Sequence, residues 1–130
     1  MKGSCQCGAV QYALTGPLRR VVGCHCTQCR KFTGHFVAAT QSALSDFCLT
    51  RENGLKWHAS SPGHRRGFCG TCGSSLFWHE DGTDHISIMA GTFDGPTGLV
   101  MDRHIHVTNK GDYYDLPAGE EIEQSALKFR

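Results

Sequence analysis

Cysteines are the residues of this sequence whose type and spacing are best suited to chemistry. The chain has eight of them in 130 residues. Seven fall into three short groups, which are Cys5-Gln6-Cys7, Cys24-His25-Cys26-Thr27-Gln28-Cys29 and Cys69-Gly70-Thr71-Cys72. Thiolates two or three residues apart can face one ion, and four-sulfur sites accept zinc or iron. The spacing therefore predicts metal binding, with zinc as the expected ion and iron as the alternative.

The first and last groups together supply the four ligands of a closed tetrahedral site. Each pair is followed by a glycine, Gly8 or Gly73, so the flanking pattern repeats. Four thiolates leave no coordination position open, and a zinc ion held in this way is structural. It would fasten the N-terminal strand to the middle of a small domain. The predicted ligands are Cys5, Cys7, Cys69 and Cys72.

The middle group differs because one short loop offers three sulfurs, those of Cys24, Cys26 and Cys29. Three protein ligands and one exchangeable position form the arrangement of a catalytic zinc. The open position could hold water or the thiolate of a substrate, because Zn²⁺ stabilises deprotonated sulfur. The sequence therefore predicts a second, catalytic zinc.

Other interpretations of these cysteines stay open. His25 could close the second site, although it lies between two ligands and is expected to point away. A distant histidine could also close it, with His35, His58, His64 and His79 as candidates. Disulfides are a further alternative, but clustered cysteines without an export signal favour a metal. Cys48 has no partner at ligand spacing and is expected to be a small buried core residue.

Composition and charge narrow the class of protein. The net charge of +1 hides nine Lys/Arg against two acidic residues in 1–75, and four against ten in 76–130. Such a split marks either an anionic partner or two parts that complement each other when packed. The chain has no apolar run that could span a membrane and no apolar segment typical of export, so we expect a cytoplasmic protein. It also lacks a long basic tail, and aromatics do not interleave its basic pairs, so nucleic-acid binding is not expected.

The elements that must position the cysteines are short strands. Segments rich in β-branched and aromatic residues alternate with turn signals, and one short helix is expected at Thr27–Lys31. This pattern predicts an all-β domain over residues 1–117, with a tail at 118–130 that forms a short helix or coil. The expected strands are Ala9–Leu14, Arg20–Cys24, His35–Gln41, Phe47–Thr50, Lys56–Ala59, His64–Phe68, Ser75–Trp78, His85–Met89 and His104–Thr108.

The cysteine motifs resemble those of the glutathione-dependent formaldehyde-activating enzymes, a family that also includes centromere protein V. The matching segments are Gly3–Val10, Cys24–Gly34, Phe68–Leu76, Ala90–Asp94 and a block from His104 to Pro117. The resemblance implies a β-tent fold, in which antiparallel sheets are clasped by the four-cysteine zinc site. It also implies the two ligand sets given above, one structural and one catalytic. Where the family usually carries a Trp, this chain has Tyr113-Tyr114, and an aromatic residue there is still expected to cover the site.

The resemblance implies a carbon–sulfur lyase that joins glutathione and formaldehyde into S-hydroxymethylglutathione. Our hypothesis is that a thiol such as glutathione enters the second site as a thiolate and attacks a small aldehyde. A fourth thiolate makes that site more negative, so basic neighbours are required. Arg30 and Lys31 are the candidates and could also bind the carboxylates of glutathione. The alternatives are a non-catalytic, zinc-stabilised binding module and, with less support, a thiol redox enzyme.

Overall fold

The computed structural model describes residues 1–123 and shows a chain built mainly of short strands. One α-helix, α1 (Thr27–Thr33), and three short 3-10 segments join them. No helix among the described residues is long and apolar enough to cross a membrane. The strands are β1 (Lys2–Ser4), β2 (Val10–Leu14), β3 (Val21–Cys24), β4 (Val37–Ala43), β5 (Phe47–Glu52), β6 (Leu55–Ser61), β7 (His64–Cys69), β8 (Ser75–Glu80), β9 (His85–Met89), β10 (Met101–Ile105) and β11 (Glu121–Ile122).

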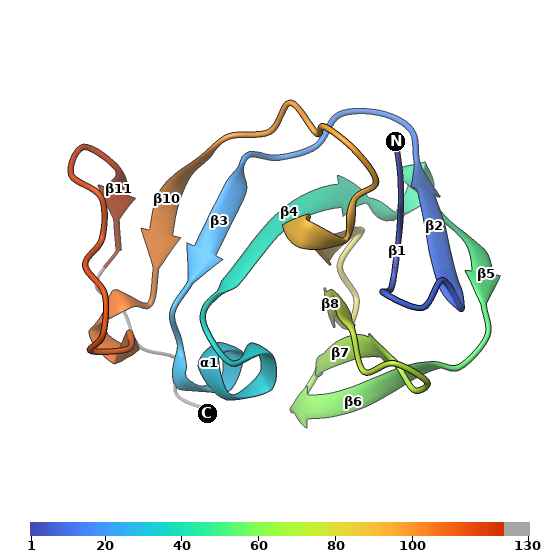
Figure 1. Ribbon diagram of the computed structural model, residues 1–130, viewed down its shortest axis with the longest axis horizontal. Coiled ribbons are helices and arrows are strands. Elements are labelled where there is room, and N and C mark those ends of the chain that lie inside the picture. Colours follow the sequence, from blue (N-terminus) through green and yellow to red (C-terminus); the bar gives the residue numbers. More distant parts are fainter. Residues whose placement is uncertain (124–130) are drawn as a thin grey trace.

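These strands form two sheets (Figure 1). The smaller sheet has the order β1-β2-β5, and the larger one has the order β11-β10-β3-β4-β9-β8-β7-β6. Most pairs are antiparallel, and β10 is parallel to both of its neighbours, β3 and β11. The larger sheet is bent, so that β10, β3 and β4 rise on one side while β7 and β6 lie across the bottom (Figure 1).

Alternation along β2 explains how the two sheets pack together. Val10, Tyr12 and Leu14 are buried, whereas the residues between them are only half-buried, as expected for a strand with one face on the core. The Tyr12 ring meets Phe77 of β8 edge-on, with centroids 5.4 Å apart. Leu76 and Ile88 of the larger sheet complete this core, so the smaller sheet is anchored to β8 and β9 by apolar contact.

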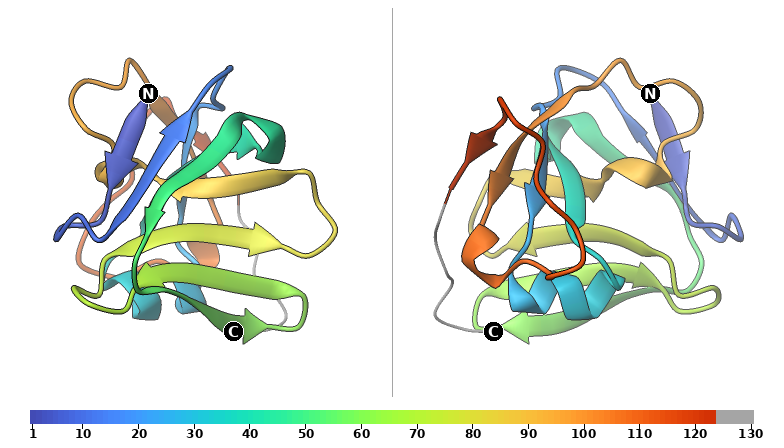
Figure 2. Two further views of the ribbon diagram at one scale, coloured as in Figure 1. Left: turned by 90° about the vertical axis from the view of Figure 1, so that its right-hand side faces the viewer. Right: turned by 60° about the vertical axis from the view of Figure 1, so that its left-hand side comes forward.

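The helix α1 is fixed at both ends by local chemistry. Cys26 is its N-cap, and the Cys26 sulfur accepts a hydrogen bond from the backbone N–H of Cys29. Gly34 ends the helix with φ 86°, and its N–H donates to the Arg30 carbonyl. The side chain of Gln28 donates to the Ser60 carbonyl at 2.7 Å, which ties α1 to β6. Figure 2 accordingly shows α1 beside the green strands β6 and β7.

The structure confirms the all-β prediction and corrects several details. Strands β1 and β11 were not predicted, and the last predicted strand lies earlier, at Met101–Ile105. The predicted tail contains β11, and its residues 124–130 lie outside the described part of the chain.

The prediction for Cys48 was wrong, since this residue is exposed. The alternation of β5 turns Phe47 and Leu49 toward the core and leaves Cys48 on the opposite face.

Candidate metal centres and the adjoining pocket

Four cysteine sulfurs from two distant hairpins converge at what we call the first centre, formed by Cys5, Cys7, Cys69 and Cys72. The four sulfurs lie within 4.8 Å of one another. The Cys5 and Cys7 sulfurs are 3.6 Å apart, and those of Cys7 and Cys69 are 3.8 Å apart. Four sulfurs each about 2.3 Å from one ion stand about 3.8 Å from each other, whereas a disulfide needs about 2.0 Å. The spacing fits a tetrahedral ion, and all four cysteines are free thiols.

Hydrogen-bond donors around the first centre favour thiolates. The Cys69 sulfur accepts hydrogen bonds from the backbone N–H groups of Thr71 at 3.4 Å and Cys72 at 3.5 Å. The bond from Cys72, and then that from Thr71, lower the pKa of Cys69. The side chain and then the backbone of Ser74 lower the pKa of Cys72 to about 5. These contacts favour anionic sulfurs at Cys69 and Cys72, as a cation site requires. At Cys7 the backbone of Ala9 acts in the same direction, but burial and the neighbouring thiols outweigh it and raise the pKa to about 11. A bound cation would offset that rise.

The second centre consists of Cys24, Cys26 and Cys29, whose sulfurs also lie within 4.8 Å of one another. Cys24 ends β3, Cys26 caps α1, and Cys29 lies within that helix. The sulfurs of Cys24 and Cys29 are 3.4 Å apart. Hydrogen bonding to the thiols of Cys26 and Cys29, followed by burial, raises the pKa of Cys24. Several thiolates cannot coexist here without a cation, and the donor set fits a soft divalent ion such as zinc.

His25 points away from the second centre although it lies between two of its cysteines. Its Nδ1 is hydrogen-bonded to the hydroxyl of Tyr114, and its Nε2 is 2.9 Å from Nδ1 of His104. His104 in turn contacts the carboxylate of Glu120. Burial, and then the neighbouring His104, lower the pKa of His25 to about 4, so the ring is neutral at neutral pH. This buried network holds the cysteine loop on the side away from the sulfurs and connects it to Tyr114 and Glu120, near the C-terminal end of the described chain.

The other predicted histidines also lie away from the sulfurs. Among the described residues, the group around the second centre contains the three cysteines and no histidine. His35 is 2.6 Å from the Tyr113 hydroxyl, and His58 stacks on Phe32. His64 faces Glu80 at 3.7 Å. Both ring nitrogens of His79 are buried without a hydrogen-bond partner in the described part of the chain.

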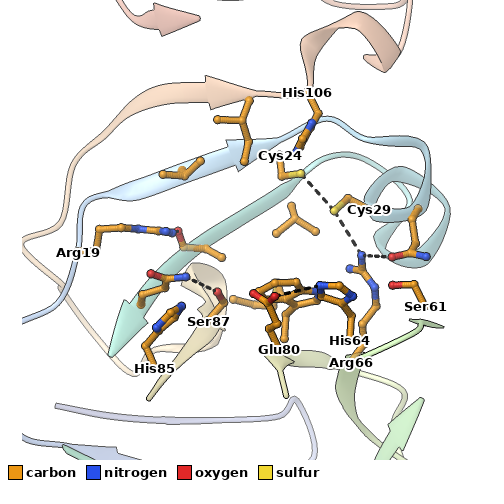
Figure 3. A pocket seen from close by; sticks show the side chains of 18 residues that line it. Arg19, Cys24, Cys29, Ser61, His64, Arg66, Glu80, His85, Ser87 and His106 are labelled. Carbon is orange, nitrogen blue, oxygen red and sulfur yellow. Dashed lines mark hydrogen bonds and ion pairs between the residues drawn. The ribbon is translucent and has the colours of Figure 1, made fainter. Parts of the chain in front are cut away.

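A pocket of about 400 Å³ opens beside the second centre and is lined by Cys24 and Cys29 (Figure 3). Its size is within the range of small-molecule sites, which is about 300–1,000 Å³. The apolar part of its wall comes from β3, β4, β8, β9 and β10, namely from Val22, Val37, Ala39, Trp78, Met89 and Ile105. The pocket therefore places two of the three sulfurs where a bound molecule could reach them, whereas none of the first-centre cysteines lines it.

Charged and polar side chains line the same pocket. Arg66 lies next to the sulfurs, while Arg19 lies on the opposite side of the cavity (Figure 3). Glu80 contributes a carboxylate at the bottom of this view, beside His64. Arg30 and Lys31, which the sequence suggested as basic neighbours, are not among the lining residues. The Arg30 Nε donates to the Asn109 carbonyl at 2.8 Å, and Lys31 is exposed on α1.

Sequence reasoning did not identify Arg66 or His106 as residues of this pocket. A signal for Arg66 was present, because strand alternation puts His64 and Arg66 on one face of β7 and Arg65 on the other. For His106 no signal existed. This residue has φ 54°, a left-handed conformation rarely adopted by residues other than glycine, which redirects the chain just after β10.

The two tyrosines expected to cover the site lie outside the pocket. Tyr114 packs against His25, with ring centroids 5.6 Å apart. The Lys110 ammonium group also lies over the Tyr114 ring, 4.7 Å from its centroid. Tyr113 remains 63% exposed. Tyr114 therefore contacts the cysteine loop through His25, on the side opposite to the sulfurs.

Comparisons with known proteins agree with this geometry. A solved structure of a Rhodobacter sphaeroides protein is similar with a TM-score of 0.59 and 26% identity, covering 78% of this chain and 98% of that one. No curated protein gives a match. The family model of the glutathione-dependent formaldehyde-activating enzyme matches residues 1–109. Because that match spans most of the chain, the protein belongs to the family of the glutathione-dependent formaldehyde-activating enzyme.

Proposed function

We propose that this protein is a zinc-dependent carbon–sulfur lyase that adds a thiol such as glutathione to formaldehyde or another small aldehyde. The observation that carries the proposal is the contrast between the two centres. The first has four sulfurs, whereas the second has three, and the pocket reaches two of them. A structural zinc needs four protein ligands, while a catalytic zinc keeps one position for a substrate.

We assign the structural zinc to Cys5, Cys7, Cys69 and Cys72, and the catalytic zinc to Cys24, Cys26 and Cys29. A zinc ion at the second centre would supply one effect, which is to keep a substrate thiol deprotonated at neutral pH. The reaction then forms a bond from the thiol sulfur to the carbonyl carbon. The carbon–oxygen double bond becomes single, and the oxygen gains the proton that the thiol lost, delivered through water.

The charges of the pocket support a thiol of the glutathione type. Glutathione carries two carboxylates and one ammonium group. For these groups the pocket offers the guanidinium of Arg19 and the carboxylate of Glu80, while the guanidinium of Arg66 lies next to the sulfurs. Arg19 is partly held by its own hydrogen bond to the Ala39 carbonyl, so its position in the wall is fixed before a ligand arrives. We expect a reducing, cytoplasmic environment, because cysteines must stay reduced to bind a metal.

Exchange spectroscopy by NMR tests the function directly. Glutathione and formaldehyde combine reversibly, and we expect zinc-loaded protein to accelerate their exchange with the adduct above the rate measured without protein. Cys24→Ser removes a sulfur that lines the pocket, and we expect the exchange rate to fall to the uncatalysed level. Cys48→Ser is the matched control, because Cys48 is exposed and belongs to neither centre. A protein with two zinc ions that accelerates nothing would contradict the proposal and favour a non-catalytic binding module.

A further inference from the structure

Arg66 is a buried cation without an acidic partner. The residue is only 3% exposed, yet none of the ion pairs among the described residues includes it. Removing a guanidinium from water is strongly unfavourable unless an anion compensates. The buried His104, by contrast, contacts the carboxylate of Glu120. The placement of Arg66 therefore indicates that an anion belongs beside it.

The groups around Arg66 show where that anion lies. Its Nη2 donates to Oε1 of Gln28 at 3.0 Å and to the Cys29 sulfur at 3.5 Å. Its guanidinium carbon is 5.3 Å from the centre of the Phe32 ring. Its Nε is buried and has no hydrogen-bond partner within residues 1–123. Figure 3 shows the guanidinium pointing from β7 toward Cys29, at the end of the pocket where the sulfurs lie.

The charge of the second centre supplies the reason for this arrangement. Three thiolates and one divalent ion sum to −1, and a substrate bound as thiolate makes the sum −2. Building up like charge in a site shielded from water is unfavourable unless a fixed cation lies near. Arg66 is the cation that lines the pocket and contacts one of the sulfurs.

We propose that Arg66 is the binding residue that allows the substrate thiol to enter the second centre as a thiolate. This inference rests on the proposed function. The thiol S–H bond breaks, the proton leaves to water, and the resulting negative sulfur is stabilised by the guanidinium. Arg19 cannot take this role, because it lies on the opposite side of the pocket and donates to the Ala39 and Arg20 carbonyls.

Cobalt-loaded protein provides a test that does not depend on activity. Co²⁺ replaces Zn²⁺ in sulfur sites, and each bound thiolate adds to a sulfur-to-metal absorption band. Glutathione and imidazole are titrated separately into the unaltered protein and into Arg66→Gln. Imidazole binds the same open position as a neutral ligand and does not need a compensating cation. We expect Arg66→Gln to weaken glutathione binding about 10- to 100-fold and to leave imidazole binding unchanged.

Neighbouring variants separate charge from structure. Arg65→Gln is the matched control, because Arg65 precedes Arg66 on β7 and stacks instead on the Trp57 ring at 4.4 Å. We expect it to bind both ligands normally. Arg66→Lys keeps the charge but loses the planar donor set, so its glutathione affinity should lie closer to the unaltered protein than to Arg66→Gln. Arg30→Gln and Lys31→Gln, titrated in parallel, test the two residues suggested by the sequence.

The outcomes are distinct. Equal loss of glutathione and imidazole binding in Arg66→Gln would mean that Arg66 only supports the fold of the centre, and this would overturn the inference. Unchanged glutathione binding in Arg66→Gln would overturn it as well, while leaving the proposed function intact. Failure of the unaltered, cobalt-loaded protein to bind glutathione would contradict the proposed function itself and this inference with it.

Discussion

At the scale of single residues, Gly23 permits the histidine network behind the second centre. It lies in β3, directly before Cys24, and pairs with His104 of β10 and Ala38 of β4. A Cβ atom at this position would stand 2.7 Å from Nδ1 of His104 and 3.3 Å from Nε2 of His25. These are the two nitrogens that are hydrogen-bonded to each other. The glycine is therefore required by the close approach of the two rings to the strand.

Gly23→Ala should consequently destabilise the protein. The added methyl group has to displace two buried histidines, and overpacking of this kind costs about 1–3 kcal/mol. The free energy of unfolding from urea titration measures this loss. Gly91→Ala is the control, since nothing lies within 4 Å of a Cβ added at Gly91, and we expect a change below about 0.5 kcal/mol. Equal stability of Gly23→Ala and the unaltered protein would show that the two rings are not held as described.

Residues whose role depends on local spacing could be predicted from the sequence, and those whose role depends on packing could not. The structure brings the seven cysteines together in the two groups that the sequence suggested. A separation of two or three residues accounts for each short group, whereas the meeting of Cys5 and Cys7 with the distant Cys69 and Cys72 was inferred from the glycine that follows each pair. Cys48 was misassigned because burial depends on which face of β5 meets the core. For Arg66, strand alternation indicates which face of β7 it shares with His64, but nothing in the sequence shows that this face looks toward Cys29, a residue 37 positions away.

At the scale of elements, β7 links the two centres. Cys69 at its end belongs to the first centre, while Arg66, three residues earlier, contacts the second. The first centre also joins the β1–β2 hairpin of the smaller sheet to the β7–β8 hairpin of the larger one. Besides the sulfurs, the backbone N–H of Gln6 donates to the Ser74 hydroxyl at 2.9 Å across the same junction. Along its length the hairpin is also held by the pairing of β2 with β5 and by the backbone N–H of Asp94, which donates to the Lys2 carbonyl. A metal at this centre would therefore fix mainly the end of the hairpin that carries Cys5 and Cys7.

Loss of the first centre should therefore loosen the N-terminal hairpin selectively. In Cys72→Ser we expect amide hydrogen exchange in β1 and in the first residues of β2 to accelerate at least about tenfold, because local opening no longer requires release of a metal. Exchange in α1 should be unchanged, since its contacts do not involve this centre. Cys48→Ser on β5 is the matched control. Uniform acceleration throughout the chain would contradict a local role for the centre.

Elements with a clear alternating or turn-bounded pattern were predictable, and those defined by their partners were not. The strand β2 alternates between buried and half-buried residues, and its start was predicted within one residue. The strands β1 and β11 have three and two residues, too few for a pattern, and exist because β2 and β10 offer them a free edge. Met101–Ile105 is parallel to β3, and the sequence holds no signal for that long-range pairing.

At the scale of the whole molecule, the division of charge in the sequence corresponds in part to contacts within the fold. Arg20 from the basic part forms an ion pair with Asp102 from the acidic part, across the β3–β10 pairing. Arg66 and Arg19 from the basic part face the pocket instead. Both interpretations of the asymmetry thus have a counterpart in the structure, since Arg20 pairs with the acidic part while Arg19 and Arg66 line the pocket.

The central claim is that one closed and one open zinc centre coexist in this chain, and metal stoichiometry tests it most directly. Native mass spectrometry of protein purified under reducing conditions should show two zinc ions per chain and, after addition of glutathione, one bound glutathione. Cys26→Ser removes a buried ligand of the second centre, so we expect this variant to retain one zinc ion and to bind no glutathione. A single zinc ion in the unaltered protein, or undiminished glutathione binding by Cys26→Ser, would contradict the account.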